Sequence, residues 1–254
     1  MSRPAPALRS IATLAAHDLR LTARRGENVL VTIVIPIAVL LFFASTGIIP
    51  APAGRTVDFL VPGAIALAIV ASGLVNLGIA TAYERSYGVL KRLGGAPLPR
   101  WGLIVAKVAA VLVLEVVQVA ALLGVGALLL GWGPGTGWSP VLLVAALILG
   151  TVAFAGLGLL LAGTLRAEAT LALANGLFLG FLMLGGIVLP IDHLPDALRP
   201  LAALLPSTAL ADLLRIALAS GLSPTPPGIA TSATILVAWA IGAAGLAIRT
   251  FRWE

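Results

Sequence analysis

Long, uninterrupted apolar runs are the feature that most constrains the fold of this chain. Each is about twenty residues or longer, enough to cross the ~30 Å hydrocarbon core of a bilayer as an α-helix. The runs do not alternate between apolar and polar residues, which excludes a transmembrane β-barrel. The sequence therefore predicts an all-α, polytopic membrane protein, a single transmembrane domain over residues 1–254. Its six predicted spans occupy residues 29–49, 59–82, 103–131, 141–164, 169–189 and 229–249.

The composition and the placement of charge agree with this class. Hydrophobic residues make up 60% of the chain and charged residues only 10%, against roughly 25% charged in a soluble domain. The net charge of +6 comes from residues that flank the runs, so nucleic acid is not an expected partner. Of the 16 lysines and arginines, thirteen fall on one side and three on the other, namely Arg55, Arg199 and Arg215. The positive-inside rule then predicts two cytoplasmic termini in a bacterial-type plasma membrane.

The N-terminal arm, residues 1–28, contains an amphipathic segment at Leu8–Arg25. This pattern is typical of a helix that lies in the membrane interface with arginines at the lipid headgroups. An ordinary surface helix packed on the rest of the protein is the alternative. The apolar stripe consists of Leu8, Ile11, Ala12, Ala15 and Leu19, and the arginines away from it are Arg9, Arg20 and Arg24.

A polar island, residues 83–102, separates the second run from the third. If it is helical, Glu84–Leu93 forms a short amphipathic helix, Gly94 and Gly95 stop it, and Pro97 stiffens the return. The alternative is a solvated loop whose basic residues only set the topology. The specific arrangement of glycine, proline and charge favours a contact with a soluble partner.

A second polar region, residues 190–228, precedes the last run and is too long for a plain loop. Pro195 can open a short helix that Pro206 ends. Ser207 can cap a second helix, in which Asp212 pairs with Arg215 at helical spacing. The sequence predicts that this pair dips into the outer leaflet, which a membrane tolerates only if the backbone is helical or covered by protein.

Few polar side chains lie within the runs. Glu115 lies about 18 Å into the third run, near the bilayer middle, and Gln118 follows one turn later. A carboxyl at this depth normally faces a bundle interior or a cavity, either on a transport pathway or as a protonated group bonded to a neighbouring helix. Asn76 and Asn175 are amides of the kind that commonly bond across helices.

Several kinds of chemistry are missing from the sequence. It contains no phosphate-binding loop, no His-Glu-x-x-His and no nucleophile elbow. It also contains no cysteine, so thiol nucleophiles and cysteine-based metal sites are excluded. We expect no catalytic site, no metal site and no cofactor bound by this chain. The energy for any active transport must then come from a partner.

The polar regions resemble those of the permease subunits of type-2 ABC exporters, a family that includes drug, polysaccharide and lipid exporters. The family's Glu-Arg-x-x-Gly-x-Leu run, with a following Pro and basic residue, is matched by Glu84, Arg85, Gly88, Leu90, Pro97 and Arg100. Lys107 falls where the family often has a lysine. The family's later motif is matched by Gly186, Pro190, Pro195, Pro206, Asp212 and Arg215. Ser86 and Lys91 depart from the family, which often has acidic residues there.

The resemblance implies a mechanism. Two permeases, identical or sisters, form a pathway at their shared interface, and each rests on a soluble ABC subunit that binds ATP and Mg. The island becomes a coupling helix in which Arg92 joins the matched residues, and Arg20 and Arg24 add a second contact. The implied cargo is a hydrophobic or amphipathic compound moved out of the cytoplasm. An ion-coupled carrier that uses Glu115, or a membrane-embedded enzyme acting on lipid, is the alternative.

Overall fold

The computed structural model describes residues 7–24, 26–48, 55–94, 100–219 and 228–251. Every regular element within these residues is a helix, in agreement with the predicted all-α class. In chain order they are α1 (Ala7–Arg24), α2 (Gly26–Thr46), α3 (Thr56–Val70), the π-helix η1 (Ala71–Asn76), α4 (Leu77–Ser86), α5 (Val89–Gly94), α6 (Arg100–Leu130), α7 (Pro140–Thr164), α8 (Ala167–Leu184), the 3-10 helix η2 (Ile191–His193), α9 (Arg199–Ala203), α10 (Pro206–Ala217) and α11 (Gly228–Thr250).

Five helices among the described residues are long and apolar enough to cross a membrane. One is the continuous helix Thr56–Ser86, formed by α3, η1 and α4, and another is Trp101–Leu130 within α6. The others are α7, α8 and α11. The first predicted span falls on α2, whose described apolar part, Thr32–Thr46, is shorter than these five. The chain is thus a multi-pass helical membrane protein, and the count of six spans remains a prediction.

Local chemistry explains where the spans end. The Ser139 hydroxyl accepts a hydrogen bond from the backbone N–H of Leu142 at 3.3 Å, and Pro140 is the first residue of α7. This is the position where the missing N–H of proline costs nothing. The fifth predicted span, 169–189, is too long, because α8 already ends at Leu184. The chain leaves the helix there, with Gly186 in the left-handed region at φ +63°.

The second span forms the centre of the bundle. Every residue from Phe59 to Val70 is buried, and α3 contacts α2, α6, α7 and α10. A close approach follows at η1, where a Cβ added to Gly158 of α7 would lie 2.5 Å from the Gly73 carbonyl oxygen. Only glycine permits that distance. Gly158 therefore lets α7 pack backbone to backbone on the second span.

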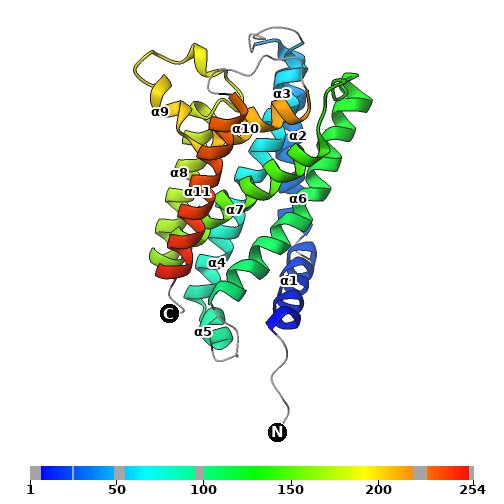
Figure 1. Cartoon of the computed structure of the whole chain (residues 1–254). Helices are drawn as coiled ribbons and strands as arrows, with labels where there is room; N and C mark the ends of the chain where they lie inside the picture. Colours follow the sequence, from blue (N-terminus) through cyan, green and yellow to red (C-terminus); the bar gives the residue numbers. More distant parts are fainter. Residues whose placement is uncertain (1–6, 25, 49–54, 95–99, 220–227, 252–254) are drawn as a thin grey trace.

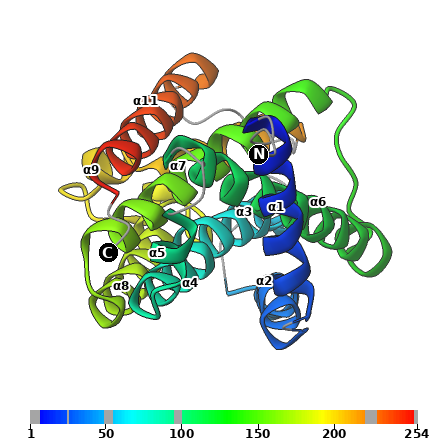
Figure 2. The same ribbon diagram turned by 90° about the horizontal axis from the view of Figure 1, so that it is seen from below.

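The two ends of the bundle carry different short helices. Figure 1 shows α5 and the last turn of α11 at one end, the α5 end, and α9 with α10 at the other, the α10 end. Figure 2, seen from below, shows α1 crossing the α5 end beside α6. Leu14 of α1 packs there with Leu90, Leu103 and Phe251. The predicted N-terminal helix is present and packs on the bundle, while its place in a membrane interface remains a prediction.

The helices predicted within 190–228 have other boundaries. The prediction that Pro195 opens a helix is wrong, since Pro195 begins a turn and α9 starts at Arg199. Pro206 is the first residue of α10, because proline suits that position, and it does not end the preceding helix. Ser207 therefore lies inside α10 and is not its cap. Most of α10 is buried, and it packs on α3, α7 and α11.

Candidate functional site

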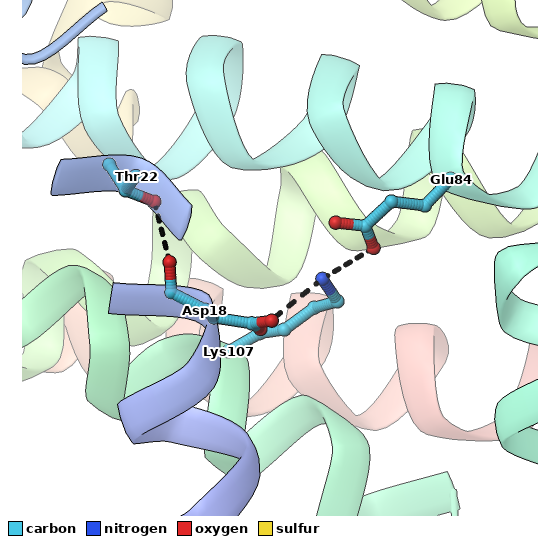
Figure 3. Close-up of polar contacts among 4 residues, drawn as sticks. All are labelled: Asp18, Thr22, Glu84 and Lys107. Carbon is cyan, nitrogen blue, oxygen red and sulfur yellow. Dashed lines mark hydrogen bonds and ion pairs between the residues drawn. The ribbon is translucent and has the colours of Figure 1, made fainter. Parts of the chain in front are cut away.

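A buried lysine joins three helices at the α5 end. The ammonium of Lys107 on α6 lies 2.7 Å from a carboxylate oxygen of Glu84 on α4 and 3.5 Å from one of Asp18 on α1. Figure 3 shows the Lys107 ammonium between the two carboxylates. A buried ammonium is stable only with such partners, because burial removes its hydration. We call Asp18, Lys107 and Glu84 the lysine cluster.

Glu84 and the following residues do not form the predicted helix over Glu84–Leu93. Glu84 lies in the last turn of α4, and the helix ends when Gly88 turns into the left-handed region at φ +72°. A new helix, α5, begins only at Val89. The prediction of one continuous helix is wrong because the Gly88 conformation cannot continue an α-helix.

The family-matched residues of the island turn toward the protein. The Arg85 guanidinium donates to the backbone carbonyl of Leu165, between α7 and α8. The Leu90 side chain is fully buried. Glu84, Arg85 and Leu90 therefore hold the island on the bundle and leave other side chains to face outward.

The outward side chains of the island are Tyr87, which is 75% exposed, Val89 and Lys91. Sequence reasoning missed the first two, although both flank Gly88, a turn-forming residue, and turns usually lie at the protein surface. Tyr87 lies against Tyr83, with ring centroids 6.0 Å apart.

For the other predicted contact residues, the structure gives the helix in which each lies or the exposure of its side chain. Arg92 lies in α5, Arg100 begins α6 and Arg24 ends α1, while Pro97 lies outside the described residues. Arg9 and Arg20 are exposed on α1. The contact of Arg20 and Arg24 with a soluble partner, and that of Arg9 with lipid headgroups, remain predictions.

A second set of polar contacts crosses the bundle beside the π-helix. The Asn76 amide donates to the Thr32 hydroxyl of α2 at 3.0 Å, and the Gln118 amide donates to the Thr32 carbonyl at 3.3 Å. The Ser72 hydroxyl donates to Gln118 at 3.1 Å. Single π-turns in α-helices often occur at functional sites. Here the turn joins α2, η1 and α6 through polar side chains.

Glu115 of α6 meets the Thr151 hydroxyl of α7. That hydroxyl also lies 2.7 Å from the Leu147 carbonyl oxygen of its own helix. Since a hydroxyl carries one proton, Thr151 can donate to Leu147 and accept from Glu115 only if the Glu115 carboxyl is protonated. The other oxygen of Glu115 has no partner among the described residues. The contact joins α6 to α7 inside the bundle.

Asn175 differs from Asn76. Its amide is exposed on α8 and donates to the carbonyl of Leu171 in the same helix, at 2.8 Å. The prediction of a bond across helices therefore fails for Asn175 within the described residues. A Cβ added at the neighbouring Gly176 or Gly180 would meet no described atom within 4 Å, so this face of α8 is open in the single chain.

A cavity lies beside the lysine cluster, between α1, α2, the second span and α6. It contains about 850 Å³ of empty space, part of it open to the outside. Polar and apolar side chains share its wall. The lining residues include Asp18, Thr22, Thr32, Ser72, Asn76, Leu77, Ala80, Glu84, Lys107, Val111 and Leu114.

At the α10 end, Arg215 fastens the segment after α8. Its guanidinium donates to the Gly186 carbonyl at 2.5 Å and to Asp212 at 3.3 Å. It also lies 3.8 Å from the centre of the Phe59 ring, a cation–π distance. The predicted pairing of Asp212 with Arg215 is present. Pro190, at the end of the fastened segment, is buried and precedes η2.

Comparison with known proteins identifies the class to which these features belong. A search of curated proteins finds no match. A family model described as "ABC-2 type transporter" matches residues 9–219, from α1 to the end of α10. The matched family acts as the membrane permease of a transporter and implies association with an ABC ATP-binding subunit. As the resemblance of its polar motifs predicted, the chain belongs to the ABC-2 type transporter family.

Proposed function

We propose that this chain is the permease subunit of an ATP-driven exporter that moves a hydrophobic or amphipathic compound out of the cytoplasm. Family membership supports the permease role. The apolar character of the bundle, in which charged residues are few, supports a drug, a lipid or a lipid-linked molecule as cargo. In this proposal the chain has six spans, with α2 as the first, and the α5 end lies in the cytoplasm.

The lysine cluster is the observation that carries the proposal. Glu84 lies four residues before Gly88, where the chain turns into α5, and its carboxylate pairs with Lys107 of α6. Asp18 ties α1 to the same ammonium. A displacement of α5 by a partner would therefore act on α1, α4 and α6 together. Such a linkage suits a permease that receives mechanical work from an ATPase carrying ATP and Mg.

The outward side chains of the island supply the surface for that partner. Tyr87 and Val89 are large apolar groups exposed at the α5 end. Aromatic anchors of this kind often dominate the binding energy of protein interfaces. We propose that the side chains of these two residues, with Lys91, bind in a cleft of the ATPase subunit, while Glu84 and Arg85 transmit the movement of that subunit to the bundle.

The open face of α8 supports a second permease. Asn175 exposes its amide beside Gly176 on a helix long enough to span the membrane. Polar groups at that depth normally face protein or water and not lipid. A second copy or a sister subunit covering this face would enclose a pathway between the two chains.

The proposal is tested by reconstituting the chain with the ATP-binding protein that copurifies with it. We expect cargo transport that requires ATP hydrolysis and is lost in Tyr87→Asp/Val89→Asp. The matched control is Val141→Asp, an exposed site in the first turn of α7, which begins beside α10 and away from the α5 end. Transport driven by a proton gradient without ATP would replace the proposal with the ion-coupled carrier. Turnover of lipid by the chain alone would replace it with an enzyme.

A further inference from the structure

In the cavity beside Lys107, the negatively charged carboxylates are accessible and the positively charged ammonium is buried. The side chain of Lys107 is only 4% exposed, whereas those of Asp18 and Glu84 are 17% and 30% exposed. The ammonium contacts one oxygen of each carboxylate, and no ion pair in the described part of the chain involves the other two oxygens. Two carboxylates against one ammonium leave a net charge of −1. A molecule in the cavity therefore meets carboxylate oxygens first.

The remainder of the cavity wall offers few polar groups that still need a hydrogen-bond partner. Asn76 already donates to Thr32, and Ser72 already donates to Gln118. The other side chains in contact with the space are largely apolar, among them Leu19, Leu77, Ala110, Val111 and Leu114. Charged hydrogen-bond acceptors are thus concentrated at the two carboxylates, while hydrocarbon surface covers much of the adjoining wall.

We propose that this cavity binds an amphiphile with a primary ammonium headgroup. The ammonium lies at the free oxygens of Asp18 and Glu84, and the hydrocarbon chain lies along Leu77 and Val111. A primary ammonium provides three N–H donors for these oxygens, and charge-assisted hydrogen bonds of this kind are strong. An anionic headgroup is disfavoured because it would face two carboxylates across a covered lysine. The site lies within one chain, apart from the pathway proposed between two permeases.

The occupant can come from two sources that share this chemistry. One is a free aliphatic amine that serves as cargo, and the other is an aminophospholipid of the surrounding bilayer. The binding itself depends only on the present chain. The proposed function enters only when the occupant is regarded as cargo.

A direct test uses the purified full-length chain in phosphatidylcholine nanodiscs, without ATPase or nucleotide. The probes are a dansyl-labelled decylamine with a free amine and the same molecule with a sulfate in place of the amine. We expect saturable binding of the amine probe and binding of the sulfate probe at least tenfold weaker. Asp18→Asn and Glu84→Gln should each weaken the amine probe by about tenfold, the loss of one charge-assisted hydrogen bond. Asp196→Asn, which changes an exposed carboxylate at the α10 end, should bind as the wild type does.

Ala80→Phe tests the same site without changing its charge. Ala80 lines the cavity and is exposed on α4, so the larger ring fills the space without entering the core. We expect this variant to lose probe binding while its thermal unfolding matches that of the wild type. Competition with phosphatidylethanolamine or with unlabelled decylamine then separates the lipid source from the free amine.

Equal affinity for the amine and sulfate probes would overturn the proposal. So would unchanged amine binding in Ala80→Phe and in Asp18→Asn. Neither result would affect the permease function, which is measured by ATP-dependent transport. Conversely, failure of the chain to act with an ATPase would leave the binding measurement intact.

Discussion

Each end of the bundle buries a basic side chain against a carboxylate, but the two basic side chains connect different parts of the structure. Lys107 at the α5 end pairs with acids on two other helices, α1 and α4. Arg215 at the α10 end pairs with Asp212 one turn earlier on its own helix and also donates to the Gly186 carbonyl. The first arrangement links separate helices through two carboxylates that water can reach. The second fastens a non-helical segment of backbone in place.

The comparison shows that a buried ion pair can either couple the movement of separate helices or hold one segment rigid, depending on which groups it joins. Partly exposed carboxylates can exchange one partner for water or a ligand at modest cost. A backbone carbonyl enclosed by protein has no such replacement, and its loss of a donor is expensive. We therefore expect substitutions at the α10 end to act on folding and those at the α5 end to act on coupling.

The largest expected effect is that of Arg215→Met. The substitution removes the guanidinium that Asp212 and the buried Gly186 carbonyl both contact, and it removes the cation above Phe59. We expect a loss of stability of about 3–5 kcal/mol, as for breaking a buried ion pair, measured by thermal unfolding in detergent. Arg199→Met is the matched control, because Arg199 is 45% exposed and lies at the same end. Equal unfolding temperatures for both variants and the wild type would contradict the fastening role.

Lys107→Met should act mainly on coupling. It leaves the carboxylates of Asp18 and Glu84 facing each other, but both can take up water. We expect a stability loss of only about 1–2 kcal/mol and a severalfold fall in transport per ATP hydrolysed. The exchange Glu84→Lys with Lys107→Glu keeps one ion pair and should recover part of the transport. Full coupling in Lys107→Met would show that the cluster transmits nothing.

Glu115→Gln tests whether the Glu115 carboxyl has a structural role or carries an ion during transport. Glutamine keeps both a hydrogen-bond acceptor and a donor for Thr151, so we expect stability and ATP-driven transport close to those of the wild type. Glu115→Leu removes the hydrogen-bond partner of Thr151 and should cost about 1 kcal/mol, as a lost neutral hydrogen bond does. The measurements are thermal unfolding and transport in vesicles. Abolished transport in Glu115→Gln, with normal folding, would favour a role on the pathway.

Tyr87→Ala has the smallest expected effect on folding. The side chain is 75% exposed, so stability should change by no more than about 0.5 kcal/mol. Affinity for the ATP-binding subunit, measured by titration of the purified proteins, should fall about tenfold if Tyr87 is an interface anchor. Trp138→Ala, an exposed aromatic residue in the connection between α6 and α7, controls for the loss of an aromatic surface group. Unchanged affinity would remove Tyr87 from the proposed interface.

Much of the fold follows from the chain itself. The predicted runs at 103–131, 141–164 and 229–249 agree with α6, α7 and α11 to within three residues. Apolar length predicts a span well because a bilayer imposes it on each helix separately. Two boundaries were predicted less well, namely the end of α8 at Leu184 and the start of α9, which was expected at Pro195 and lies at Arg199. There, proline and glycine admit several local structures, and packing against α10 selects one of them.

The site was predictable in its residues but not in its contacts. Glu84, Arg85 and Lys107 are recognisable from charge at the edge of an apolar run. No local pattern indicates that Glu84 meets Lys107, or that Asn76 bonds to α2 while Asn175 bonds to its own helix. The first two contacts join residues distant in sequence, so each depends on how whole helices are placed.

The sequence alone determined the membrane class, the family and the position of the polar island between two spans. Hydrophobicity, charge placement and short motifs act locally, and one chain is enough to show them. Only the tertiary structure decided which way the island faces: Glu84 and Arg85 inward, Tyr87 and Val89 outward. The physical reason is that a buried ammonium on α6 requires carboxylates. The packing of α1 on α6 brings Asp18 within its reach, and the packing of the second span on α6 brings Glu84.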